Sequence, residues 1–574
     1  MFRTMLAIIA LGMGVATAIA DDLPIGRTID RFKLQDFQGA WHDWNDWSNR
    51  DLVVVAFVGT ECPVAKLYGT RLTELAADYG SRGVQFVAID SNQQDSLAEL
   101  AQFARIHKIE FPLLKDAGNV VADQFGAVRT PEVYVLDRQR RVQYQGRIDD
   151  QFGVGFSRVA PQEHDLKNAL DALLAGKPVA KPATAAVGCH IGRIERRPPR
   201  GDVTYSRQVA PILQNHCVRC HRAGEIAPFT LTSYQDVLGW TGTIREVLDE
   251  SRMPPWHADP RHGKFSNDRR LPDAKKRLVL EWIENGAPEG DPRQLPPPAT
   301  FSDGWQIARP DLIVEMAQPY TVPSRGTVEY QYFPIAATFD KDRWLAAAEA
   351  RPGNRAVVHH IILFFVPPDG RQDLAESSLY HPLAVFAPGM AGWTAPSGMA
   401  KRIPAGSKLW FQMHYTPNGA AQQDLSRAGL VFADEKSVHR PITTTTIINF
   451  RLQIPPGAAS HKLQSAYRFE KDTQIVSLLP HMHLRGKAFR FEAQMPDGQR
   501  SVLLDVPRYD FNWQTVYVLE QPLRMPRGSQ LLCFAEFDNS AKNLANPDPT
   551  KTVSWGEQTW DEMMVGQFES VDDE

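Results

Sequence analysis

Short apolar runs alternate with amphipathic stretches through the first third of the chain. The apolar runs are rich in β-branched residues and predict buried strands, whereas hydrophobic residues at helical spacing predict helices between them. The expected strands are 52–58, 84–89 and 132–136, and the expected helices are 64–79 and 97–107. This alternation predicts an α/β domain, which we place at residues 22–176.

The pattern changes twice further along the chain. Helical spacing dominates 209–215, 244–250 and 275–285, which predicts a small all-α domain at residues 203–289. Beyond it, short strand-like runs recur with Pro, Gly and Asn between them, at 312–316, 357–365, 408–415, 444–452, 474–479 and 531–537. They predict a β-sandwich architecture. Segments rich in Pro, at 177–202 and 290–307, are expected to be linkers.

Composition and the first residues narrow the class of protein. A chain of 574 residues is long enough for several domains, and its formal net charge of -4 gives no reason to expect nucleic acid as a partner. Arg3, an apolar run at 5–15 and the small residues Ala18 and Ala20 predict a signal peptide at 1–20. No apolar run reaches the roughly 20 residues that span a bilayer. We therefore expect a periplasmic or secreted protein without a transmembrane segment.

Cys62 stands where the first buried strand meets a helix, and Thr130-Pro131 precedes a later strand. With these features the first domain resembles thioredoxin-like and peroxiredoxin-like redoxins. The resemblance implies a Cys at a helix N-terminus, which lowers the thiol pKa, with a cis-Pro facing it. Ala65 occupies the place of a second dithiol Cys, and Thr60 lies two residues before Cys62, where peroxiredoxins have a Thr three residues before.

Cys189 is the thiol left to pair with Cys62. A disulfide between Cys62 and Cys189 is possible in an oxidising compartment. Three interpretations stay open: a redox-active Cys62, a structural disulfide, or an inert thiol.

The all-α region contains the motif Cys217-Val218-Arg219-Cys220-His221. Two thiols at this spacing can attach to the vinyl groups of a haem, and the adjacent His then becomes an axial iron ligand. The sequence holds no second Cys pair to complete a zinc site. It therefore predicts haem c bound through Cys217, Cys220 and His221.

The sixth ligand of the haem iron is expected from the segment that follows a predicted helix. Met253 precedes two prolines and resembles the distal Met of small bacterial cytochromes. His257, His262 and an open coordination position are the alternatives.

Three groups of histidines fall in the β-rich region. They are His359-His360, His414 next to Tyr415, and His481-Met482-His483. Residues two apart on a strand point to one face, so His481 and His483 can share a metal. His359 and His360 would normally point to opposite faces, and their spacing alone does not assign both to one ion.

The order of these histidines, followed by Asp561-Glu562-Met563, resembles the copper type II, ascorbate-dependent monooxygenases, the family of peptidylglycine hydroxylating enzymes and dopamine hydroxylase. The resemblance covers about residues 310–571. It implies two tandem β-sandwich, jelly-roll-like domains at 308–438 and 439–574. It also implies two copper ions, held by His359, His360 and His414 and by His481, His483 and Met563, with Met564 as a neighbouring alternative. In this family the first copper relays an electron, and the second binds molecular oxygen and hydroxylates the substrate.

Departures from the family limit the expected substrate. Leu479 stands where the peptide-amidating branch has an Arg that binds the substrate carboxylate, and Val565 and Gln567 replace an Asn and a Tyr. The substrate is therefore an unknown small molecule and not a peptide carboxylate.

Together these features predict an exported, copper-dependent monooxygenase in which His481, His483 and Met563 are catalytic. Electrons would come from the haem, from ascorbate or from another periplasmic electron donor. Two alternatives remain: a non-enzymatic electron-transfer or copper-holding protein, and a thiol-based peroxidase or oxidoreductase that acts through Cys62.

Overall fold

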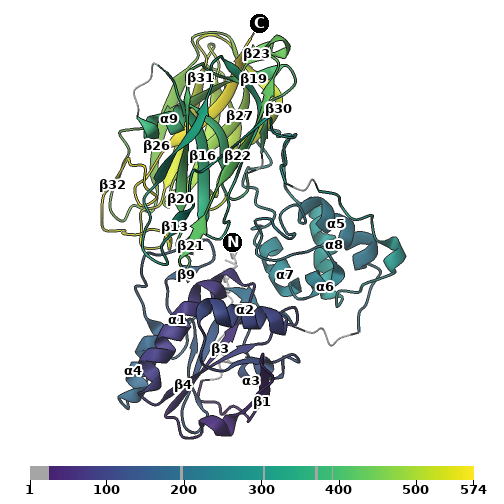
Figure 1. Ribbon diagram of the computed structural model, residues 1–574, viewed down its shortest axis with the longest axis vertical. Helices are drawn as coiled ribbons and strands as arrows, with labels where there is room; N and C mark the ends of the chain where they lie inside the picture. Colours follow the sequence, from purple (N-terminus) through teal and green to yellow (C-terminus); the bar gives the residue numbers. More distant parts are fainter. Residues whose placement is uncertain (1–24, 194–197, 302–303, 369–372, 391, 574) are drawn as a thin grey trace, which may run out of the picture.

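The computed structural model describes residues 25–193, 198–301, 304–368, 373–390 and 392–573. The signal peptide expected at 1–20 lies outside these residues. Figure 1 shows an α/β region in purple and blue, a helical region in teal, and a β-rich region in green and yellow. Within the described ranges, no helix has the length and apolar character needed to cross a membrane.

A seven-stranded sheet forms the α/β region, with the strand order β2-β1-β5-β4-β3-β7-β8. The central strand β3 (Leu52–Val58) is buried along its whole length, because helices cover both faces of the sheet. It pairs parallel with β4 (Val84–Asp90) and antiparallel with β7 (Glu132–Leu136). The other strands are β1 (Lys33–Asp36), β2 (Trp41–Asp43), β5 (Leu113–Lys115), β6 (Arg129–Thr130), β8 (Val142–Gly146), β9 (Phe152–Gly153) and β10 (Phe156–Ser157).

Helices pack on both faces of this sheet. On one face, α1 (Pro63–Gly80), α2 (Leu97–His107) and α4 (Asp165–Leu174) share a core with the even-numbered residues of β3. On the other face lie η1 (Trp44–Trp47) and α3 (Val120–Phe125). The predicted strands and helices of this region thus agree with the structure to within a residue or two. Cys62 is the residue before α1, and Pro63 is its first residue.

The segment expected as the first linker is partly built into the α/β region. Within 177–202, β11 (Cys189–His190) pairs antiparallel with β6. The backbone N–H of Gln145 also donates to Pro182 O at 2.9 Å. A Pro- and Ala-rich segment lacks the periodicity of a strand, yet its extended backbone can still add to a sheet edge. The linker boundary predicted from composition is therefore wrong for residues 182–191.

The second region consists of short helices around a small core. Val209, Leu213, Trp240 and Trp282 are buried in it. The helices are η2 (Tyr205–Val209), α5 (Ala210–His216), α6 (Tyr234–Leu238), α7 (Thr241–Asp249) and α8 (Asp273–Glu284), followed by η3 (Pro292–Gln294).

A loop of the helical region leaves it and packs on the β-rich region. Trp256 and Phe265 are buried in the hydrophobic core of the last 130 or so residues, which is the length of an ordinary small domain. Backbone bonds hold the loop in place, from Asp259 N to Asp505 O at 2.8 Å and from Ser266 N to Val518 O at 2.9 Å. The helical region predicted at 203–289 is therefore not a separate unit.

Two pairs of sheets make up the β-rich region. In the first pair, the sheet β12-β22-β15-β19-β23 and the sheet β14-β20-β16-β17 share one core. The bounds are β12 (Leu312–Glu315), β13 (Tyr320–Val322), β14 (Gln331–Thr338), β15 (Arg343–Arg351), β16 (Val358–Val366), α9 (Leu374–Tyr380), β17 (Pro382–Phe386), β18 (Trp393–Thr394), β19 (Met399–Ile403), β20 (Lys408–Tyr415), β21 (Gln422–Asp424), β22 (Arg427–Ala433), η4 (Glu435–Ser437) and β23 (Arg440–Pro441).

In the second pair, the sheets β24-β33-β27-β30 and β26-β31-β28-β29 share another core. The bounds are β24 (Thr443–Ile448), β25 (Gln453–Ile454), β26 (His461–Arg468), β27 (Thr473–His481), β28 (Gly486–Gln494), β29 (Arg500–Val506), β30 (Tyr517–Met525), β31 (Gln530–Phe537), β32 (Val553–Ser554) and β33 (Val565–Asp572). The candidate histidines lie on β16 and β20 of the first pair of sheets, and at and just after the end of β27 in the second pair.

Candidate functional site

Cys62 lies in a closed thiol site between two strands and a helix. Its Sγ donates to Thr130 O at 2.8 Å, and the backbone N–H of Cys189 donates to Cys62 Sγ at 3.4 Å. Cys62 is only 1% exposed. The peptide bond between Thr130 and Pro131 is cis, as the redoxin resemblance implies. The structure thus brings Cys62 and Cys189 together as two free thiols.

The two thiols have opposite acidities. Burial raises the pKa of Cys62, but hydrogen bonds from Cys189 and from the Ala65 N–H stabilise the thiolate and lower its pKa to about 6. The pKa of Cys189 is raised well above its usual value by the neighbouring Cys62 and by burial. Cys62 is therefore the more acidic thiol of the pair, and the acidic thiol is the one that forms a thiolate more readily.

A carboxyl group precedes the nucleophile. Burial, together with the nearby carboxylates of Asp95 and Glu99, raises the pKa of Glu61 to about 7. Asp95 in turn accepts the backbone N–H of Thr60 at 2.7 Å. Glu61 can therefore exchange a proton near neutral pH beside the thiol. The sequence analysis did not single out Glu61, although its place directly before Cys62 in the sequence could have suggested it.

The Cys217-Cys220-His221 motif follows α5 in a tight turn. The backbone N–H of His221 donates to Cys217 O at 3.0 Å. His221 Nδ1 lies 3.2 Å from Phe229 O, which fixes the ring and leaves Nε2 available as a ligand. Phe229 stacks on Trp240, with ring centroids 3.8 Å apart.

Cys220 opens into a cavity of about 330 Å³ between the helical and β-rich regions. Pro254 and Pro255 line it from the helical side, and Val385 and Met390 line it from the β side. The residue before these prolines, Met253, is half-buried.

The alternative ligands lie in the loop that packs on the β-rich region. His257 is close to Asp510 and Arg508, and His262 follows Asp259 in a turn. Of the three expected sixth ligands, Met253 is thus the one whose neighbours reach the cavity at Cys220.

His359, His360 and His414 form a compact cluster. One ring nitrogen of each lies within 4.8 Å of the others. His360 and His414 face each other on β16 and β20, and the pairing shifts by one residue between Val358 and His360. His359 is the extra residue of this β-bulge, which turns its side chain toward its neighbours. The expectation that adjacent histidines point apart is therefore wrong here, because it assumes a regular strand.

His481, His483 and Met563 lie together on the second pair of sheets. The His481 and His483 rings have centroids 5.2 Å apart, and both side chains line one small cavity with Met563. The buried carboxylate of Glu562 accepts the backbone N–H groups of His483 and of Arg485, the latter at 3.0 Å. It also accepts the N–H of Met563 at 3.1 Å, and so ties the His-x-His segment to the segment that leads into β33.

The two clusters share their surroundings. Phe511 stacks on His359 with ring centroids 4.9 Å apart, and it lies 5.9 Å from His483. The small cavity, of about 90 Å³, is lined by His360 as well as by His481 and His483. The two groups of expected ligands therefore lie close together, and His360 lines the same cavity as His481 and His483.

These imidazoles are neutral and poorly hydrogen-bonded. Burial lowers the pKa of His359 to about 4 and that of His360 to about 3. Both ring nitrogens of His359, and Nδ1 of His414, are shielded from solvent and have no hydrogen-bond partner among the described residues. Lone pairs of buried neutral imidazoles are the usual ligands of copper and zinc.

Outer partners orient three of the rings. His360 Nε2 lies 3.2 Å from Gln412 Oε1, His414 Nε2 lies 3.3 Å from Thr559 Oγ1, and His481 Nδ1 lies 2.8 Å from Gln514 Oε1. Such partners fix the tautomer of a ligating imidazole.

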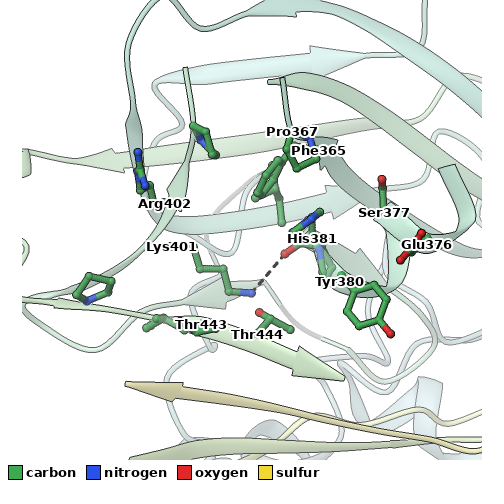
Figure 2. Close-up of a pocket in the computed structure, with 15 residues that line it drawn as sticks. Phe365, Pro367, Glu376, Ser377, Tyr380, His381, Lys401, Arg402, Thr443 and Thr444 are labelled. Atoms are coloured by element: carbon green, nitrogen blue, oxygen red, sulfur yellow. Dashed lines mark hydrogen bonds between the residues drawn. The ribbon is translucent and has the colours of Figure 1, made fainter. Parts of the chain in front are cut away.

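A larger cavity lies away from these histidines. Figure 2 shows it between the two pairs of sheets, with a volume of about 800 Å³ and with Lys401, Thr443 and Thr444 in its lining. None of the candidate ligands lines it. A second cavity, of about 390 Å³, lies between the α/β and β-rich regions and reaches His359 and His414.

The α/β fold, with a thiol at the start of α1 and a cis-Pro beside it, defines a thioredoxin-like redoxin domain. Residues 25–145 match the AhpC/TSA family, so the chain carries an AhpC/TSA redoxin domain. The chain is 23% identical over 122 residues to the thiol-disulfide oxidoreductase ResA of Bacillus thuringiensis subsp. konkukian, which covers 21% of this chain and 69% of ResA.

Two further proteins are similar to parts of this chain. The chloroplastic peroxiredoxin Q of Oryza sativa subsp. japonica is 27% identical over 126 residues, which covers 21% of this chain and 57% of that protein. The crystal structure of a hypothetical protein from Sinorhizobium meliloti is 31% identical, covers 30% of this chain and 96% of its own, and gives a TM-score of 0.28.

Proposed function

We propose that this chain is an exported oxidoreductase whose redoxin domain works through Cys62 and Cys189. The supporting observation is the contact of a buried thiol of lowered pKa with a second, protonated thiol. The match to the AhpC/TSA family, and the similarity to a thiol-disulfide oxidoreductase and a peroxiredoxin, favour the same chemistry.

The reaction is a two-electron oxidation of the pair by a hydroperoxide. The Cys62 thiolate attacks the terminal peroxide oxygen, an S–O bond forms, the O–O bond breaks, and an alcohol leaves after protonation. The Cys189 sulfur then attacks the Cys62 sulfenic acid, so that an S–S bond forms and water leaves. A dithiol returns both cysteines to thiols by exchange.

Mass spectrometry of the reduced protein after one equivalent of hydroperoxide tests this chemistry. We expect a loss of two hydrogens and a Cys62–Cys189 peptide in the non-reduced digest. A Cys62→Ser variant should show neither, whereas Cys533→Ser, which changes a buried thiol of the β-rich region, should behave like the unchanged protein. Unchanged thiols in the native chain would contradict the proposal.

A second function is favoured by the imidazole cluster. We propose that His359, His360 and His414 hold one copper, that His481, His483 and Met563 hold another, and that the β-rich region is a copper-dependent monooxygenase. The donors fit this metal, since imidazole binds both oxidation states of copper and the thioether favours Cu(I). When bound, copper would supply oxygen chemistry and one-electron transfer.

Four residues around the proposed ligands would hold them in place. Gln412, Gln514 and Thr559 hold rings in orientation, and Glu562 holds the turn of His483 against Met563. The cavity of about 90 Å³ lined by His481, His483 and Met563 would leave room only for a small substrate beside the second copper.

Anaerobic Cu(I) titration with metal analysis is the test for the second function. We expect two copper ions per chain and oxygen uptake by the reduced, loaded protein in the presence of ascorbate. Two copper ions without oxygen uptake from any donor would favour a copper-holding or electron-transfer protein instead. Fewer than two would contradict the ligand assignment.

We also propose a covalent haem c on Cys217 and Cys220, with His221 and Met253 as axial ligands, as a relay of electrons from a periplasmic donor. The hydrogen bond that orients the His221 ring, and the place of Cys220 in the wall of the cavity of about 330 Å³, support this proposal. Expression with the haem-maturation machinery should give a red protein that keeps its colour in acid-acetone. Met253→Ala should then lower the haem potential, and an unchanged potential would favour His257 or His262.

A further inference from the structure

The strand β11 covers the thiol site. It pairs with β6 on the residues just before the cis-Pro, and Ile191 N also donates to Val128 O at 2.8 Å. Gly188 makes this approach possible, because a Cβ at that position would lie 2.0 Å from Thr130 O. An extended segment that joins this edge is the way in which a peptide adds to a sheet. Here the chain's own backbone takes that place, and Cys62 is buried beneath it.

The helical region holds β11 down. His190 Nε2 lies 2.8 Å from Glu246 Oε2 on α7, and the His190 backbone N–H donates to Thr243 Oγ1 at 3.2 Å. Arg129 joins the two sides, because it donates to Glu246 Oε2 at 2.6 Å and to Gly188 O at 2.8 Å. Glu246 thus receives hydrogen bonds from both the strand that carries Cys189 and the strand beneath it.

We propose that Glu246 is a positioning residue of the thiol site, which acts through His190 and Arg129 to keep the Cys189 strand over Cys62. The redoxin domain alone therefore does not contain the complete site. This inference concerns the same thiol pair as the proposed function and rests on it for the chemistry.

The covered site has a consequence for its substrates. A protein disulfide must lay an extended segment along β6 to reach Cys62, and that edge is occupied. A small hydroperoxide needs no such edge. The substrate class is therefore small hydroperoxides, with protein thiols and disulfides excluded as long as β11 is in place.

Alkylation of the reduced full chain by two reagents tests the role of Glu246. Iodoacetamide is small, whereas a maleimide on a long polyethylene glycol requires an open edge. Glu246→Gln keeps the size of the side chain but removes the charge that binds His190 and Arg129. We expect the ratio of the bulky to the small reagent rate at Cys62 to rise at least tenfold.

A pH profile separates positioning from general destabilisation. The groups that act electrostatically on Cys189 are Glu246 and Arg129, besides Cys62 itself. When the strand loosens, Cys62 loses its bonds from Cys189, and the midpoint of its iodoacetamide profile should move upward from about pH 6. Glu246→Asp should restore part of the unchanged behaviour.

Arg245→Gln is the matched control, since this neighbour on α7 pairs with Glu284 on the surface. Circular dichroism checks that each variant is folded. Equal reagent ratios and equal midpoints in Glu246→Gln and Arg245→Gln would overturn the positioning role. Failure of the native chain to form a disulfide with hydroperoxide would instead refute the proposed chemistry, and the alkylation result would stand independently of it.

Discussion

The thiol site and the imidazole centre are both buried, but they differ in how their polar atoms are satisfied. Cys62 has hydrogen-bond partners on two strands, and its charge is stabilised by the chain itself. In the imidazole centre, both ring nitrogens of His359 lack hydrogen-bond partners among the described residues. A buried unsatisfied polar atom costs about 1–3 kcal/mol. The polar atoms of the first site are therefore satisfied by the chain itself, whereas the second site leaves buried lone pairs, and these support our proposal of a metal there.

The two sites also differ in what makes them reactive. The thiol site has a nucleophile whose reactivity depends on neighbouring residues, so substitutions of those residues should change its pH profile. The imidazole centre has only lone pairs to offer, so substitutions there should change affinity for a metal. Three predictions test this division, from the largest expected effect to the smallest.

The largest effect is expected from His414→Ala. This change removes one of three clustered imidazoles, and we expect copper affinity at that cluster to fall by more than the ~10–100-fold that loss of an outer partner costs. Competition titration with a Cu(I) chelator measures it. His439→Ala, on an exposed residue near Gly398, is the control and should leave both copper ions bound. An unchanged stoichiometry and affinity in His414→Ala would dismiss the cluster as a metal site.

Cys189→Ala should have an intermediate effect. Without the Cys189 thiol, the pKa of Cys62 should return toward the ordinary value of about 8.5. Because a pKa of about 6 leaves Cys62 mostly ionised at pH 7, the thiolate fraction should then fall roughly 30-fold. The iodoacetamide profile reports the midpoint. A midpoint that stays near pH 6 would mean that the helix N-terminus and not Cys189 sets the acidity.

The smallest effect is expected from Gln514→Leu. Gln514 accepts from His481 Nδ1 at 2.8 Å, and its loss should weaken copper binding at the His481 and His483 site by roughly tenfold. The other copper should bind as before. Gln499→Leu, in an exposed turn, serves as the control for the substitution itself. Equal affinities in the two variants would show that Gln514 does not orient the ring.

Much of the fold could be predicted because its hydrophobic pattern is regular. β3 is apolar along its length, and α1 and α2 carry their buried residues at helical spacing, so their bounds follow from local sequence. The contact of Cys62 with Cys189 also agrees with a pairing suggested by the count of thiols. In these cases local pattern and chemistry point to the same answer.

Other features depend on contacts that no local pattern encodes. The bulge at His359 arises from the pairing of β16 with β20, and the pairing of β11 with β6 arises from a close approach at Gly188. Glu246 lies on a helix more than a hundred residues from Arg129 in sequence, and no pattern relates the two. To predict any of these features, one must know how segments that are distant along the chain are aligned with each other.

The loop that carries Trp256 and Phe265 also restricts how this gene could have been assembled. Loss of a buried aromatic residue costs about 3–5 kcal/mol, and these two side chains of the helical segment are buried in the core of the last sheets. A recombination event that exchanged residues 203–289 for a foreign haem-binding segment would remove both. Inheritance of the helical segment and the final sheets is therefore linked.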